Sequence, residues 1–189
     1  MAEAAYKRAT YEDVWRVPAH KVAELVDGVL HTHPRPAAKH ARAASRLGME
    51  LGPPFDNGDD GPGDWIILDE PELHFAEDIV VPDLAGWRKQ RMPTLPDVAF
   101  FELPPDWICE VLSHSTAAFD RSEKLPIYAR EGVKHAWLID PSLQTLEVLE
   151  PHTARNAPRW QLLHTFQGQD AVRAEPFDAL PLRLDRLWS

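Results

Sequence analysis

The sequence predicts an α/β (α+β) fold in which a central mixed β-sheet is flanked by helices and extended by β-hairpins. An apolar run at Trp107–Leu112 is typical of a strand covered on both faces. A helical stretch and a second apolar run, Val133–Asp140, follow it, and this strand–helix–strand order implies a right-handed crossover within the sheet. The pair Asp27-Gly28 between two strand-like segments predicts a hairpin.

Local signals define the elements of the N-terminal part. Thr10 is the expected N-cap of a short helix, with Asp13 three residues later in the capping-box position. Residues 21–33 are expected to form the hairpin. The Ala-rich residues 37–51 predict a helix, which Pro53 and the proline after it should end.

The C-terminal part carries one further helix signal and several short apolar runs. Asp120 is the expected N-cap of a helix that reaches Arg130, because Glu123 follows three residues later. Gly132 is the expected helix terminator. The remaining strands are expected at residues 65–68, 72–75, 79–81, 143–149, 160–166, 171–172 and 182–184.

Two carboxylates lie in or beside buried strands. Side chains alternate along a strand, so Glu110 shares an apolar face with Ile108 and Leu112. Asp83 follows a short apolar run and a proline. A buried carboxylate is costly unless it is paired, hydrogen-bonded or bound to a metal, so the two acids indicate a functional site. The proline-containing residues 90–105 are expected to wrap this site as a loop.

Composition and length limit the class of protein. The chain has 189 residues, of which 44% are hydrophobic and 26% charged, so we expect one globular domain spanning residues 1–189. The sequence has no apolar run long enough to cross a membrane and no apolar signal core, so we expect a cytoplasmic protein. The single Cys109 alternates with Glu110 and is expected to be a buried core thiol.

The charge of the chain disfavours non-specific binding to nucleic acid. The formal net charge is −10 at pH 7, and a polyanion is attracted by the opposite sign. A nucleic-acid enzyme of this charge needs a local basic patch, for which Arg88–Arg91 is the best candidate. The same four residues are equally typical of a solvated loop.

Six segments between about residue 11 and residue 149 occur together in an order known from one protein family. They are Glu24-Leu-Val-Asp-Gly28, His40, Val81-Pro-Asp83, Ile108-Cys-Glu-Val-Leu-Ser113, Asp120…Lys124…Tyr128 and Gly132-Val…Trp137-Leu-Ile-Asp-Pro141. Each segment is weak alone, whereas the ordered set is fairly specific. The set resembles the Uma family of bacterial endonucleases, in the PD-(D/E)XK, restriction-endonuclease-like superfamily. The resemblance implies a restriction-endonuclease-like core with a mixed sheet flanked by helices.

The resemblance also implies a catalytic site. Asp83 and Glu110 match the two acids of the superfamily and are implied to be ligands of Mg²⁺, with Mn²⁺ as a possible substitute. Leu112 stands where the superfamily usually has a lysine, and Lys124 matches the lysine that this family carries on the following helix. Glu24 matches an acid that completes the metal shell or binds a ligating water. The implied catalytic set is therefore Asp83, Glu110, Lys124 and Glu24, acting on DNA.

Other readings of the sequence stay open. The net charge and the missing lysine at Leu112 also suit an inactive nuclease-fold scaffold, and another phosphate substrate is a third possibility. His31, His33 and His40 could contribute to a zinc site, although no set of four ligands is evident. A serine-hydrolase site at Ser113 is weakly indicated by the adjacent histidine. We expect no membrane association and a homodimer or higher homo-oligomer.

Overall fold

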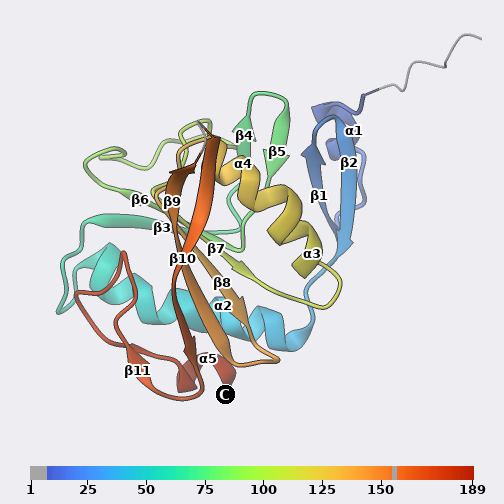
Figure 1. Ribbon diagram of the computed structural model, residues 1–189. Helices are drawn as coiled ribbons and strands as arrows, with labels where there is room; N and C mark the ends of the chain where they lie inside the picture. Colours follow the sequence, from blue (N-terminus) through green and yellow to red (C-terminus); the bar gives the residue numbers. More distant parts are fainter. Residues whose placement is uncertain (1–7, 155–156) are drawn as a thin grey trace, which may run out of the picture.

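A six-stranded mixed sheet forms the centre of the protein (Figure 1). The computed structural model describes residues 8–154 and 157–189. Strands β7 and β8 are parallel, and the other neighbours in this sheet pair antiparallel, which confirms the predicted mixed sheet. Across the sheet the strands are β3 (Trp65–Asp69), β6 (Leu84–Arg88), β7 (Trp107–Val111), β8 (His135–Asp140), β9 (Thr145–Ala154) and β10 (Ala157–Gln167).

A second, four-stranded sheet stands beside the central one and carries the predicted hairpin. Its strands lie in the order β2 (Val29–Pro34), β1 (Lys21–Val26), β5 (Asp78–Val80) and β4 (Leu73–Phe75). Asp27 and Gly28 both adopt positive φ, of 51° and 77°, as a two-residue hairpin turn requires. Near the C-terminus, β11 (Ala171–Val172) pairs with β12 (Leu182–Arg183).

The helices cover both faces of the central sheet (Figure 1). Helix α2 (Ala38–Leu51) packs against one face, where Cys109 and Val111 are buried. The opposite face is covered by residues 117–130, called helix 117–130 below, which comprise α3 (Ala117–Phe119), a π-helical turn and α4 (Leu125–Arg130). The short helices α1 (Tyr11–Trp15) and α5 (Asp185–Trp188) lie near the two ends of the chain. In the described part of the chain, no helix is long and apolar enough to cross a membrane.

The alternation of side chains along β7 places Glu110 on the same face as Ile108 and Leu112, as predicted. Ile108 and Leu112 belong to the apolar cluster on the side of helix 117–130, and Cys109 belongs to the cluster on the opposite side. Glu110 therefore faces helix 117–130. Cys109 is fully buried, and burial raises the pKa of its thiol well above the usual value, so it is a core residue and not a nucleophile.

Three local predictions differ from the structure. The helix predicted to begin at Asp120 begins one turn earlier, with Thr116 as its N-cap. The chain does not leave the helical path at Pro53, because a π-helical turn (Gly52–Asn57) continues it and buries Phe55. The loop at residues 90–105 does not line the site pocket. It lies beside β4 instead, where the backbone of Phe101 bonds with Glu72 and His74.

Candidate active site

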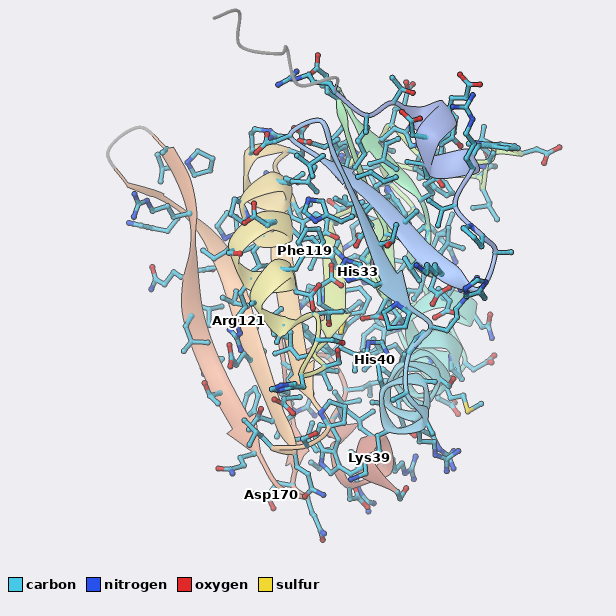
Figure 2. The ribbon with its side chains drawn as sticks, turned by 90° about the vertical axis from the view of Figure 1, so that its right-hand side faces the viewer. His33, Lys39, His40, Phe119, Arg121 and Asp170 are labelled. Carbon is cyan, nitrogen blue, oxygen red and sulfur yellow. The ribbon has the colours of Figure 1, made fainter. Side chains whose placement is uncertain are left out.

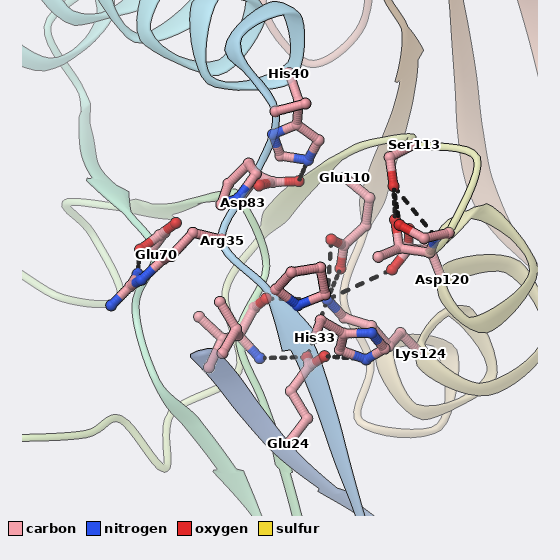
Figure 3. Close-up of a pocket in the computed structure, with 17 residues that line it drawn as sticks. Glu24, His33, Arg35, His40, Glu70, Asp83, Glu110, Ser113, Asp120 and Lys124 are labelled. Carbon is pink, nitrogen blue, oxygen red and sulfur yellow. Dashed lines mark hydrogen bonds and ion pairs between the residues drawn. The ribbon is translucent and has the colours of Figure 1, made fainter. Parts of the chain in front are cut away.

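One pocket of about 190 Å³ collects all four residues of the predicted catalytic set (Figure 3). Its walls come from the β1–β2 hairpin with residues 34–37 on one side and residues 113–116 on the other. Figure 2 shows the same region between the hairpin and helix 117–130, with His33 and His40 facing the viewer. The residues in the pocket are Glu24 from β1, Asp83 before β6, Glu110 from β7 and Lys124 from helix 117–130.

Lys124 lies at the centre of the buried acids. Its Nζ is 2.9 Å from Glu110 Oε1, 3.0 Å from Glu24 Oε1 and 3.8 Å from Asp120 Oδ1. The same ammonium donates to the carbonyl oxygen of Val81 at 2.9 Å. Burial alone would lower the pKa of Lys124, but the surrounding carboxylates outweigh it and raise the pKa above its ordinary value. The lysine therefore stays protonated.

Glu110 is held from one side by two residues of the same helix. Tyr128 donates its hydroxyl hydrogen to Glu110 Oε1 at 2.7 Å, and Lys124 contacts both carboxylate oxygens. Only 2% of Glu110 is exposed. Burial raises the pKa of Glu110 well above its usual value, and neighbouring acids add to this effect while Lys124 opposes it. A cation that entered the pocket would stabilise the ionised form.

Asp83 joins the pocket from the opposite side of Glu110. Its Oδ2 accepts a hydrogen bond from the backbone N–H of Val111 at 2.7 Å, which ties the start of β6 to the end of β7. His40 Nε2 from α2 lies 3.3 Å from the same oxygen (Figure 3). Burial lowers the pKa of His40, but its hydrogen bond with Asp83 and the nearby acidic charges raise the pKa above the usual value. Protonated His40 would add positive charge beside Asp83.

Glu24 faces the lysine from the hairpin. Its Oε1 accepts the backbone N–H of Val81 at 2.9 Å as well as the contact from Lys124. Its other oxygen lies 3.7 Å from His33 Nε2, which has no hydrogen-bond partner among the described residues. Burial lowers the pKa of His33, with Glu24 opposing the effect. The neutral imidazole therefore offers a polar group that lines the pocket beside Glu24.

Asp120 is a member of the site that local sequence signals did not identify. The prediction made it an exposed helix N-cap, but the helix begins earlier and its carboxylate is buried beside Lys124. Burial raises the pKa of Asp120 to about 6, against the attraction of Lys124. The spacing Asp120-Lys124-Tyr128, four residues at each step, is the signal that places all three on one helix face.

The mouth of the pocket adds hydrogen-bond donors that are not in the predicted catalytic set. Arg35 lines it, donates to the carbonyl oxygen of Ala19 at 3.0 Å and lies 3.4 Å from Glu70 Oε2, so it is paired at the mouth itself. On the facing wall, the hydroxyl of Ser113 bonds with those of Ser115 and Thr116, at 3.1 Å and 2.9 Å. These groups are of the type that contacts phosphate oxygens. No periodic or capping pattern distinguishes them in the sequence.

The segment Arg88–Arg91 is not the free basic patch that was considered. Arg88 pairs with Asp64 and covers the ring of Trp65, and Arg91 Nη1 lies 2.8 Å from Asp106 Oδ1. Lys89 donates to two backbone carbonyl oxygens in residues 56–63. None of these residues lines the active-site pocket. The positive charges of Arg88, Lys89 and Arg91 therefore interact with groups of the protein itself.

Two alternative sites receive no geometric support. Within residues 8–154 and 157–189, no three His, Cys, Asp or Glu side chains are grouped as a preassembled metal site, which holds for the histidines and for Glu24, Asp83 and Glu110 alike. His31, considered for zinc, lies against the ring of Phe119, with centroids 4.5 Å apart. The Ser113 hydroxyl, considered as a nucleophile, is engaged by the hydroxyls of its own turn while His114 is exposed.

Comparisons with known proteins agree with this architecture. A family model described as "Uma2: Putative restriction endonuclease" matches residues 9–185. A solved structure, the crystal structure of "a putative nuclease belonging to DUF820" from Anabaena variabilis, is similar with a TM-score of 0.74. It is 22% identical, and the similarity covers 95% of this chain and 97% of that chain. A search of curated proteins finds no match. The fold class predicted from the sequence is thereby confirmed.

Proposed function

This chain belongs to the Uma2 family, and from that premise we propose that it is a metal-dependent endonuclease that hydrolyses phosphodiester bonds in DNA. The observation that supports the proposal most is the convergence of Asp83, Glu110 and Lys124, from three separate elements, in one pocket. Three buried carboxylates, those of Glu24, Glu110 and Asp120, lie within 4 Å of one lysine, and a fourth, Asp83, lines the same pocket. Such an excess of buried negative charge favours a site for a cation.

The donor set suits Mg²⁺ or Mn²⁺. Both ions prefer oxygen ligands, and Mg²⁺ keeps several waters, so one or two carboxylates can hold it. Asp83 and Glu110 would hold the ion, with Glu24 acting through a bound water, since its carboxylate faces Lys124 and the Val81 amide. When bound, the ion supplies positive charge that acidifies water and offsets the charge of the phosphodiester.

The residues of the chain supply the remaining functions. His40 and the Val111 amide orient Asp83, and Lys124 with Tyr128 orients Glu110. Glu24, at the edge of the lysine cluster, can accept a proton from the attacking water. Arg35 and the hydroxyls of residues 113–116 are placed to bind phosphate oxygens at the mouth.

A second function remains as an alternative, that of an inactive nuclease-fold scaffold. The cations of Arg88–Arg91 are paired within the protein, and this favours the scaffold. A chain with a net charge of −10 then lacks the basic patch considered for binding a polyanion such as DNA. We propose a homodimer or higher homo-oligomer for either function. Sedimentation of the purified protein would measure the oligomeric state.

The test is cleavage of supercoiled and single-stranded DNA with Mg²⁺, Mn²⁺ or EDTA. Wild type is compared with Asp83→Asn and with Asp170→Asn, a matched change at an exposed aspartate outside the pocket. We expect metal-dependent nicking by wild type and Asp170→Asn, and none by Asp83→Asn. A folded wild type that neither nicks DNA nor binds Mn²⁺ in calorimetry would leave the scaffold as the function.

A further inference from the structure

One helix presents a continuous polar stripe to Glu110. Asp120, Lys124 and Tyr128 follow each other at intervals of four residues, so they lie on one face of helix 117–130. All three are buried, with 4%, 3% and 0% exposure. A buried polar stripe on a helix that otherwise packs with apolar residues is costly unless each group has a partner. Lys124 and Tyr128 have Glu110 of β7 as their partner, and Asp120 lies beside Lys124.

Three groups of the protein lie within 3.0 Å of the Lys124 ammonium. An ammonium group has three donors and no acceptor. Lys124 Nζ donates to the carbonyl of Val81 at 2.9 Å and to Glu110 Oε2 at 3.0 Å, and it lies 3.0 Å from Glu24 Oε1. A phosphate oxygen could bond with this ammonium only by displacing one of these three partners, two of which are charged.

Tyr128 completes the hold on Glu110 from the next turn of the helix. Its hydroxyl donates to Glu110 Oε1 at 2.7 Å. Burial raises the pKa of this phenol well above its usual value, so it remains a donor across the working pH range. Lys124 and Tyr128 together contact both oxygens of Glu110, which fixes the plane of the carboxylate.

We propose that Lys124 and Tyr128 are positioning residues, which together clamp the carboxylate of Glu110, and that Lys124 does not contact the substrate. This assigns the helix lysine a role distinct from that of a lysine which acts directly on water or phosphate. The proposal rests on the proposed function for the role of Glu110 in metal binding. The lack of substrate contact at Lys124 is testable without any metal.

The first experiment measures the reactivity of individual lysines in the folded, metal-free protein. An acylating reagent is applied at pH 8, and modification of each lysine is followed by peptide mass spectrometry. We expect Lys124 to react at least about 100-fold more slowly than the exposed Lys39, because the reagent needs an accessible, neutral amine. Equal acylation rates of Lys124 and Lys39 in urea would confirm that the fold protects Lys124. Equal rates in the folded protein would overturn the proposal.

The second experiment removes only the hydroxyl group of the clamp. Mn²⁺ affinity and melting temperature are measured for wild type, Tyr128→Phe and the matched control Tyr11→Phe, whose ring lies beside His74 and outside the pocket. We expect Tyr128→Phe to bind Mn²⁺ about 10- to 100-fold more weakly, as is typical for loss of a group that orients a ligand. The control should match wild type in Mn²⁺ affinity. A residue that only supported the fold would change melting without changing Mn²⁺ affinity.

The outcomes separate this inference from the function on which it rests. Unchanged Mn²⁺ affinity in Tyr128→Phe, with a wild type that binds and cleaves, would overturn the clamp alone. A wild type that binds no Mn²⁺ would overturn the metal-dependent function and the positioning role of Tyr128 with it. The lysine reactivity would then still decide whether Lys124 can reach a substrate.

Discussion

Nζ of Lys124 lies 2.9 Å from Oε1 of Glu110 and thereby joins a helix to the central strand of the sheet. In the superfamily that the sequence resembles, the lysine usually follows the acid on the same strand. Here that position is Leu112, which is buried in the apolar cluster beneath helix 117–130. The cation therefore reaches the acid from a different element, and the geometry of their contact depends on how the helix packs on the sheet.

The variant Glu110→Gln tests whether this acid takes part in the reaction. Glutamine has nearly the same shape but carries no charge, so the pocket would lose one of its two proposed metal ligands with little change in packing. We expect metal-dependent nicking to fall at least about 100-fold. Initial rates with Mg²⁺ measure the effect. Glu147→Gln, which removes a carboxylate that bonds with Arg121 outside the pocket, should retain the wild-type rate.

Asp120 should make the metal-free protein less stable at alkaline pH. Its folded pKa of about 6 exceeds the ordinary value of 3.8, so the folded state binds this proton more tightly than the unfolded state. The stabilisation is complete below about pH 4 and is lost as the pH rises through about 6. Asp120→Asn lacks this dependence. We expect it to be more stable than wild type at pH 8, by at most about 3 kcal/mol, and similar to wild type near pH 4.

Melting temperatures between pH 4 and pH 8 provide the check on Asp120. A difference of 1 kcal/mol corresponds to roughly 2–4 °C in a protein of this size. An Asp120→Asn variant that melts below wild type at pH 8 would show that the carboxylate stabilises the fold as an ion-pair partner of Lys124. Chelator in the buffer keeps the comparison free of bound metal.

The basic segment should contribute to stability and not to DNA binding. Arg91→Ala removes the contact with Asp106, and we expect a loss of about 1 kcal/mol with unchanged DNA affinity. Arg35→Ala, at the mouth of the pocket, should instead weaken binding and lower the slope of log K against log salt by about 1. Fluorescence anisotropy of labelled DNA, with Ca²⁺ and at several salt concentrations, measures the DNA affinity and the salt slope of each variant. A reduced slope in Arg91→Ala would contradict this assignment.

Gly132→Ala should isolate the cost of a left-handed backbone. Gly132 ends helix 117–130 with φ of +85°, and a Cβ added there would meet no atom within 4 Å. The free energy of unfolding should therefore fall by about 1 kcal/mol, from backbone conformation alone. Urea unfolding measures this loss. Gly168, with φ of +83° and equally open space, provides a second site where the same substitution should have a similar effect.

Much of the fold follows from short-range patterns in the sequence. The period of two along Trp107–Val111 separated Glu110 from Cys109, and the structure places them on opposite sides of the sheet. The hairpin turn at Asp27-Gly28 and the helix end at Gly132 both require positive φ, and these residues adopt positive φ in the structure. These features depend on neighbouring residues only, so local reasoning is sufficient for them.

Contacts between distant segments explain what was missed. The spacing of Glu123 favoured Asp120 as a cap, yet the helix begins at Thr116 and buries Asp120 beside Lys124. The cations of Arg88–Arg91 appeared available for DNA, and their partners Asp64 and Asp106 lie 24 and 15 residues away. The contact of His40 with Asp83 likewise joins α2 to the start of β6. No local pattern encodes the pairs between distant segments, because these arise when the elements pack, whereas the four-residue spacing of Asp120 and Lys124 is visible in the sequence.

The dispersal of the pocket over the chain has a consequence for biosynthesis. Its acids begin at residue 24 on the hairpin, and its lysine is residue 124 on the helix that crosses to β8. A nascent chain on the ribosome, or one with a detached helix 117–130, lacks the contacts that hold Glu110. Under the proposed function, hydrolysis therefore requires helix 117–130 to be packed on the sheet, and a fragment cut upstream of that helix should be inactive because it lacks Lys124 and Tyr128.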